Sequence, residues 1–247
     1  MRPKSPIVHR IYFSDLSGLS VAAAGAEEFV IEGPEAHHAV TVKRLRVGEP
    51  IQLFDGCGMV AEGSALHVET GKRASVVVRI EAVTESVRPP ARLEVWCPPP
   101  KGDRLEWLID QLSQVGVACW RPMKTDRVER NAFRTDKLER VCVESAKQCG
   151  RDWLLEIGPW AGFDELLSDP RAWLADASGS AGTISGRDGV IGFGPEGGWS
   201  PHEIEAFRAT DRPVLRFGAH VMRIETAAVV GAGRLLSDMQ TTGGDRA

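Results

Sequence analysis

Cysteine is scarce in this sequence of 247 residues, and its spacing argues against two common structural roles. No two cysteines form a C-x-x-C pair, which argues against a structural zinc site, and their odd number argues against a disulfide framework. We therefore expect buried, reduced thiols and no bound metal. The five residues are Cys57, Cys97, Cys119, Cys142 and Cys149.

Long apolar runs are lacking as well. No stretch reaches the ~18 consecutive apolar residues that suggest a membrane helix, and residues 1–6 contain no apolar signal core. We expect no membrane span and a cytoplasmic location. The length suits one large domain or two modest ones, without internal repeats or low-complexity tracts.

Positive charge is low overall but locally concentrated. The formal net charge is −4, yet residues 72–151 carry 16 Lys and Arg against 11 Asp and Glu. Basic side chains at intervals of three or four residues can follow a phosphate backbone, although the interleaved acids also fit a solvated surface. The cluster comprises Arg121, Lys124, Arg127, Arg130, Arg134, Lys137 and Arg140.

The hydrophobic pattern changes at a proline-containing linker, residues 85–90, which predicts two domains, 1–85 and 91–247. The first reads as a small β-barrel and the second as an α/β domain with a parallel sheet. Strands are expected at 8–13, 28–31, 50–54, 59–66, 75–83, 92–96, 119–122, 172–175, 190–193 and 214–217. Helices are expected at 35–45, 104–115, 137–149, from 200 onward, and at 225–236, with an exposed loop at 179–189.

A glycine-rich loop joins the strand at 190–193 to a helix start. Ser200 suits the N-cap of that helix, Pro201 its first position, and Glu203 completes a capping box. Glycines between a strand and a helix let a backbone approach a nucleotide-like ligand closely, although turns use glycine without any ligand.

The same loop matches a dinucleotide fingerprint, Gly192-x-Gly194-x-x-Gly197. In a Rossmann unit the helix begins within the fingerprint, whereas here it begins only at Ser200, after the fingerprint. Only 49 residues follow Gly198, too few for the rest of such a domain. A nicotinamide-dependent oxidoreductase is therefore a minor alternative.

A second strand-to-helix segment follows the glycine loop. The two motifs read Phe193-Gly-Pro-Glu-Gly-Gly198 and Phe217-Gly-Ala-His-Val-Met-Arg-Ile-Glu-Thr-Ala227. This pair resembles the SPOUT superfamily, and most closely the RsmE-like family of 16S ribosomal RNA uridine-N3 methyltransferases.

The resemblance covers nearly the whole chain. It includes the opening strand at 9–13, residues 37–46, Gly48 and residues 53–56, then residues 101–117 and Glu144–Arg151. It implies a PUA-like RNA-binding barrel before a trefoil-knotted methyltransferase domain that forms a homodimer. Gln114 and His220 depart from the family pattern, which usually has Glu at the first position and often Pro-Arg at residues 219–220.

The resemblance also implies S-adenosylmethionine as cofactor and 16S RNA, within the small ribosomal subunit, as partner. Arg223 would orient the uridine and Glu196 the ligand, although a salt bridge and a turn cap are equally simple roles. The general base is not identified. The expected cofactor contacts are Phe193, Gly194, Glu196, Gly197, Gly198, Leu215, Phe217, Gly218, Val221 and Met222.

RNA contacts are expected from basic and polar side chains in both domains, although surface solvation explains each of them as well. They are Arg10, Lys43, Arg44, Arg46, Arg127, Gln148 and Arg151. Two further hypotheses remain open beside the leading one. The chain could methylate another RNA, such as transfer RNA, or it could be an RNA-binding module with an inactive site.

Overall fold

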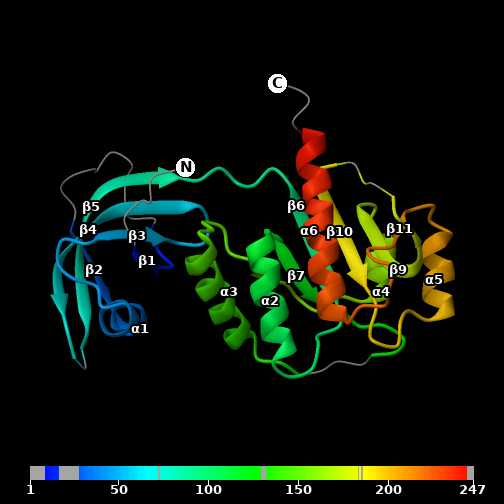
Figure 1. Ribbon diagram of the computed structural model, residues 1–247, viewed down its shortest axis with the longest axis horizontal. Helices are drawn as coiled ribbons and strands as arrows, with labels where there is room; N and C mark the ends of the chain where they lie inside the picture. The colour runs from blue at the N-terminus through cyan, green and yellow to red at the C-terminus, as the bar shows by residue number, and fades with distance from the viewer. Residues whose placement is uncertain are drawn as a thin grey trace. The chain divides into compact units, whose positions relative to one another are not determined.

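The computed structural model describes residues 9–16, 28–71, 73–128, 132–182, 184 and 186–243. The chain divides into two compact units (Figure 1). Unit 1 comprises Met1–Arg88 and Ala146–Leu154, and unit 2 comprises Pro89–Ser145 and Leu155–Ala247. The short second segment of unit 1 lies in the stretch that the sequence pattern assigns to the second domain.

Unit 1 is built on a five-stranded sheet in the order β1-β3-β4-β5-β2. β1 pairs with β3 in parallel, and the other pairs are antiparallel. Alternate residues of each strand point into an aliphatic core, which explains the period-two pattern of the sequence. The strands are β1 His9–Tyr12, β2 Glu28–Glu32, β3 Pro50–Phe54, β4 Met59–Glu69 and β5 Ser75–Glu85.

The helix expected at 35–45 is shorter and less regular than predicted. It begins with α1, Gly33–His37, and continues as a π-helix, η1, His38–Val42. The amide of Lys43 donates to the carbonyl of His38, five residues back. The helix ends at Val42, three residues before the predicted end at Leu45, and Arg44 beyond it takes a left-handed conformation with φ of 56°.

Unit 2 contains a six-stranded, fully parallel sheet in the order β11-β9-β10-β6-β7-β8. This confirms the predicted α/β class. The strands are β6 Arg92–Cys97, β7 Cys119–Pro122, β8 Glu156–Ile157, β9 Ala172–Ser180, β10 Asp188–Phe193 and β11 Val214–Leu215. The helices are α2 Arg104–Val115, α3 Thr135–Cys149, α4 Phe163–Ser168, α5 Pro201–Arg208 and α6 Ile224–Gly243.

Helices bury both faces of this sheet. α2 packs against α6, and α6 packs against β6 and β10 (Figure 1). Residues of α2, α3 and α6 share one apolar core, while α4 and α5 contribute to a second. Adjacent residues of one strand serve opposite faces, as Val95 and Trp96 of β6 do.

Several elements of unit 2 differ from the sequence-based prediction: β11 ends at Leu215 instead of residue 217, and α6 runs to Gly243 instead of residue 236. β8 has two residues and α4 has six, so neither is long enough to show a period in the sequence. β9 runs on to Ser180, into the expected exposed loop, because Gly179 packs against the backbone of β11. Among the described residues, no helix has the length and hydropathy that crossing a bilayer requires.

Candidate active site

The two motif-bearing loops leave the same edge of the parallel sheet. One loop follows β10 and leads to α5, and the other follows β11 and leads to α6. β9 lies between these strands. Since neighbouring strands are about 4.8 Å apart, the loops start roughly 10 Å from each other. The carboxyl edge of a parallel sheet is where ligands of α/β proteins usually bind.

An aromatic pair joins the beginnings of the two loops. The rings of Phe193 and Phe217 lie 5.9 Å apart, with an angle of 37° between their planes. Both rings rest on α6 at Gly231, where an added Cβ would lie 2.6 Å from Phe193. Phe193 is buried, so it acts as a support beneath the first loop.

Arg104, at the start of α2, links both loops through charge. Its Nη1 donates to Oε1 of Glu196 at 2.8 Å and lies 3.5 Å from Oε1 of Glu225. The hydrogen bond and charge of Arg104 hold the pKa of the Glu196 carboxyl below its usual range. The charges of Lys101 and Arg223 lower this pKa further, by smaller amounts. Glu196 and Arg223, the two candidate catalytic residues, thus lie within one group of charges.

The buried carboxylate of Glu225 is incompletely satisfied. Its side chain is 8% exposed, and its Oε1 faces Arg104. Its Oε2 is one of the few buried side-chain atoms in the described part of the chain that have no hydrogen-bond partner. An acceptor of this kind, below two ligand-type loops, is suited to a donor from a bound molecule.

A turn at residues 125–128 supports the glycine loop from the side. Arg127 donates through Nη1 to the carbonyl of Gly197, so this predicted RNA contact holds the loop backbone. Glu203 is buried and accepts from the amides of Ser200 and Asp126 at 2.7 and 3.0 Å. Ser200 accepts from the amide of Glu203, which confirms the predicted capping box.

At two positions of this loop, the local structure explains why the residue is glycine. Gly198 has φ of 70°, a left-handed conformation that side chains disfavour. A Cβ on Gly194 would lie 3.0 Å from Nε1 of Trp199, whose indole donates to the carbonyl of Ala175 at 2.9 Å. The loop is therefore packed closely on its own tryptophan.

The expected apolar walls of the cofactor site occupy different environments. Leu215 is buried in the core and Phe217 is partly buried. Met222 is partly buried, and its Cε would lie 3.3 Å from a Cβ on Gly218. Val221 is 92% exposed, so it forms a wall only if a ligand or another chain covers it.

The expected RNA contacts of unit 1 are mostly at its surface. Lys43, Arg44 and Arg46 are exposed at the end of η1, and Gln148 is exposed on the last turn of α3. Arg151 is partly buried and donates through Nε to the carbonyl of Trp153 at 2.9 Å.

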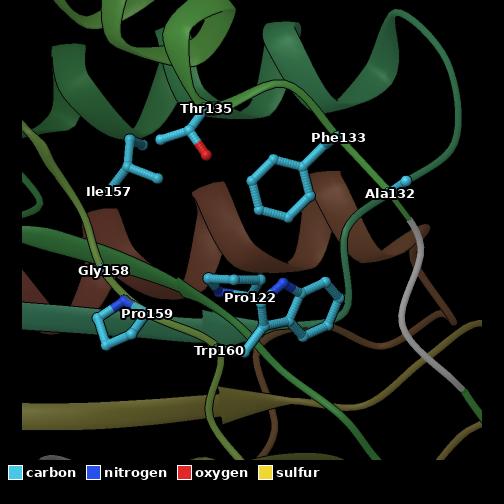
Figure 2. Close-up of a pocket in the computed structure, with 8 residues that line it drawn as sticks. All are labelled: Pro122, Ala132, Phe133, Thr135, Ile157, Gly158, Pro159 and Trp160. Atoms are coloured by element: carbon cyan, nitrogen blue, oxygen red, sulfur yellow. The ribbon is translucent and has the colours of Figure 1, made fainter.

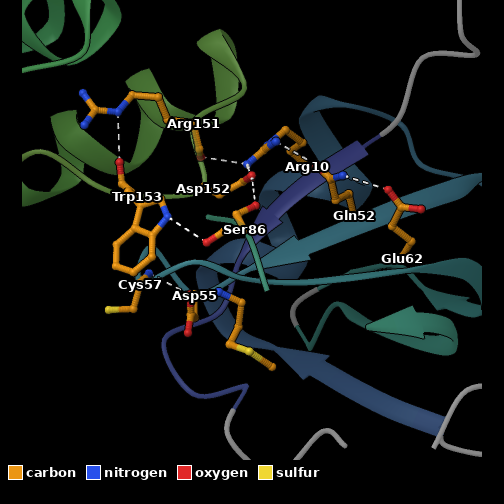
Figure 3. A network of polar contacts seen from close by, with 10 residues as sticks. Arg10, Gln52, Asp55, Cys57, Glu62, Ser86, Arg151, Asp152 and Trp153 are labelled. Carbon is orange, nitrogen blue, oxygen red and sulfur yellow. Dashed lines mark hydrogen bonds and ion pairs between the residues drawn. The ribbon is translucent and has the colours of Figure 1, made fainter. Parts of the chain in front are cut away.

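Arg10 is instead the centre of an internal polar network (Figure 3). It donates to Gln52 at 2.7 Å, to the carbonyl of Arg151 at 2.8 Å and to Asp152 at 2.9 Å. The guanidinium also lies 4.5 Å from the centre of the Phe54 ring. These contacts are made inside unit 1, so Arg10 has a structural role beside any contact with RNA.

Sequence reasoning assigned no role to Arg104 or Glu225. Both lie in segments that carry the family resemblance. A sequence motif, however, does not predict which charged side chains of separate segments contact each other. In the described residues no three His, Cys, Asp or Glu side chains gather as a metal site would require.

Comparison with known protein families gives two matches. A model described as RNA methyltransferase domain matches residues 87–236, and one described as RNA methyltransferase PUA domain matches residues 31–64. The chain is 24% identical to ribosomal RNA small subunit methyltransferase E of Bacillus subtilis, over 95% of this chain and 99% of that one. It is 29% identical to the Mycobacterium bovis protein of the same name, over 83% and 84%.

Solved structures share the fold. A small subunit methyltransferase E from Neisseria gonorrhoeae, bound to S-adenosylmethionine, superimposes with a TM-score of 0.76 at 22% identity, covering 94% of this chain and 98% of that one. A methyltransferase from Legionella pneumophila with the same cofactor gives 0.76 at 23% identity, covering 93% and 97%.

Proposed function

The chain belongs to the RNA methyltransferase domain family, and from this premise we propose that it methylates N3 of a uridine in 16S ribosomal RNA, using S-adenosylmethionine. The observation that carries the proposal is the family match over residues 87–236, together with whole-length relatives named for the small-subunit RNA. The convergence of both motif loops on Arg104 supports it.

The charges of the site fit this cofactor. S-adenosylmethionine carries a positive sulfonium, an ammonium and a carboxylate, and supplies an electrophilic methyl group. Glu196 and Glu225 offer negative charge, and Oε2 of Glu225 offers a free acceptor. Lys101 and Arg223 offer positive charge near the same loop. Gly197, Gly198 and Gly218 let the backbone approach an adenosine group closely.

The residues of the site then have distinct tasks in the transfer. Loss of the N3 proton to a base places negative charge on the uridine, and that charge is consumed when the N–C bond forms and the methyl–sulfur bond breaks, which would leave a neutral thioether. In this proposal Arg223 stabilises that charge at a uridine carbonyl oxygen. Glu196, held as a carboxylate by Arg104, orients the ligand. Most of the rate enhancement comes from positioning and charge.

The remaining parts of the proposal concern organisation. Residues 1–85 act as an RNA-binding domain, with Lys43, Arg44 and Arg46 facing phosphates, and residues 91–247 act as the methyltransferase domain. We propose that this second domain is knotted and pairs with a second copy, which would cover Val221. The enzyme would act in the cytoplasm, on RNA within the small subunit.

Two measurements, made one after the other, test the proposed function. Calorimetry with S-adenosylmethionine and with NAD separately should show binding of the first alone. Transfer of tritiated methyl to unmodified 16S RNA, assembled small subunits and transfer RNA should then label a small-subunit substrate, and mass mapping should place the label on uridine N3. Label in transfer RNA alone would show that the enzyme methylates transfer RNA instead. If the protein binds neither S-adenosylmethionine nor NAD, it is an RNA-binding module.

A matched pair of variants tests the assigned role of Arg223. Arg223→Ala should lower the rate of methyl transfer at saturating cofactor, whereas Arg216→Ala, an exposed arginine of the same loop, should not. Equal rates for the two variants would remove Arg223 from the mechanism.

A further inference from the structure

A hollow of about 510 Å³ lies in unit 2 at the ends of β7 and β8, and its lining includes no residue of the two motif loops (Figure 2). Three segments form it: the end of β7, the chain after β8, and the residues just before and at the start of α3. Figure 2 shows their side chains ringing the space. The lining comprises Pro122, Ala132, Phe133, Thr135, Ile157, Gly158, Pro159 and Trp160.

The wall formed by residues 158–160 is held in place by Arg121. This side chain is 16% exposed and donates to the carbonyls of Pro159 and Trp160 at 3.1 and 3.5 Å. It also pairs with Glu165 at 2.9 Å. A Cβ on Gly158 would lie 2.6 Å from Cγ of Arg121, so the backbone of the wall packs against Arg121 at a distance that only glycine permits. The hollow is thus preformed.

The lining is aromatic and almost without charge. The rings of Phe133 and Trp160 lie 5.8 Å apart at 34° and form one continuous wall. Thr135 contributes a hydroxyl group. A flat, neutral, aromatic ligand with polar edges suits such walls, and an RNA base has these properties.

The rim carries the complementary charge for an RNA backbone. Arg134, between two lining residues, has 74% of its side chain exposed, although it pairs with Asp136. Lys124 is exposed, and its amide donates to the carbonyl of Ala161, the residue after Trp160. Both belong to the positively charged stretch of the sequence, so an aromatic hollow lies among cations that attract phosphates.

The order of the strands separates this hollow from the reacting base. β6 lies between β10 and β7, and β8 lies beyond β7. At about 4.8 Å per strand, the ends of β7 and β8 are roughly 10 to 15 Å from the end of β10. A base in the hollow is therefore a neighbour of the nucleotide at the glycine loop.

We propose that this hollow binds an unpaired base that flanks the methylated uridine in the substrate RNA. The proposal rests on the proposed function and adds a specificity site to it. The enzyme would then recognise its target by splaying two nucleotides apart, with one at the motif loops and one stacked on Trp160.

Substitutions at Trp160 test the stacking. Trp160→Leu keeps an apolar side chain but removes the ring, and it should weaken binding of unmodified 16S RNA by about 5- to 150-fold, the range for one stacked base. Trp160→Phe should restore most of the affinity. Trp107→Leu, at a half-exposed tryptophan of α2, is the control and should bind RNA normally. Affinity for S-adenosylmethionine should be unchanged in all three.

An abasic scan identifies the bound nucleotide. In a 16S RNA fragment around the mapped uridine, each flanking base is removed in turn. One position should weaken binding to the wild type but cause no further loss in Trp160→Leu, because its partner is already missing.

The outcomes separate this proposal from the function itself. Wild-type RNA affinity in Trp160→Leu, with methyl transfer intact, would overturn the base pocket alone. A parallel loss of cofactor affinity would overturn it as well, since the hollow would then serve the cofactor. Absence of methyl transfer by the wild type would overturn the function, while a Trp160-dependent RNA affinity would still support the pocket.

Discussion

Gly231 of α6 offers a direct test of how the two motif loops are supported. A methyl group at this position would lie 2.6 Å from Cζ of Phe193 and 3.1 Å from Cδ2 of Phe217. Gly233, two residues later on the same helix, has nothing within 4 Å of an added Cβ. Gly231→Ala and Gly233→Ala therefore add the same methyl group to the same helix. Only the methyl group at residue 231 clashes with neighbouring side chains.

The magnitude follows from two opposing effects. Alanine is favoured over glycine inside a helix by about 1 kcal/mol, and both variants gain this. At Gly231 the Phe193 ring must retreat by about 0.8 Å to restore an ordinary contact of 3.4 Å, and it is buried. Overpacking of this kind costs about 1 to 3 kcal/mol. We expect Gly233→Ala to be more stable than Gly231→Ala by about 1 to 3 kcal/mol.

Denaturant titration measures this difference, and initial rates of methyl transfer measure its effect on the site. Because displaced rings shift both loops, Gly231→Ala should lower kcat/KM by about 10- to 100-fold, whereas Gly233→Ala should leave it unchanged. If Gly231→Ala is as stable and as active as Gly233→Ala, the aromatic pair does not position the loops.

Three further outcomes are expected. Ser200→Ala should lower the free energy of unfolding by about 0.5 to 2 kcal/mol in denaturant titration, since it removes the N-cap acceptor, and an unchanged midpoint would count against the cap. Arg104→Ala should lower kcat/KM by about tenfold or more, because one guanidinium joins both loops, and wild-type rates would exclude that role. Burial raises the pKa of Cys97 to about 12, so its thiolate forms only near that pH. Cys57 and Cys149 are exposed, contrary to the expectation of buried thiols, so iodoacetamide at about pH 8 should modify them and spare Cys97, as mass spectrometry would show; labelled Cys97 in the native protein would contradict this.

Much of the fold was predictable because its signals are local. The capping box at Ser200 lies within four residues, and the predicted strand at 119–122 and helix at 104–115 match the observed ones. Short elements such as β8 had no period to detect. The early end of the helix expected at 35–45 was missed because the residue type of Arg44 does not predict its left-handed conformation.

The candidate site was only partly predictable because it depends on contacts between distant segments. The motifs located the loops, but the bridge from Arg104 to Glu196 joins residues 92 positions apart. Arg10 looked like a surface cation, yet it satisfies acceptors at residues 52, 151 and 152. Sequence shows that a charge exists, whereas the fold decides whether it meets another side chain or a ligand.

The second segment of unit 1 has a consequence for synthesis on the ribosome. Phe54 and Val60 pack with Ala146 and Leu154, which emerge only after about 66 further residues beyond Arg88 have been translated. At roughly 5 to 20 residues per second, this is a delay of about 3 to 13 seconds. During that interval the apolar side chains of Phe54 and Val60 lack this cover, and a fragment that stops at Arg88 would lack it permanently.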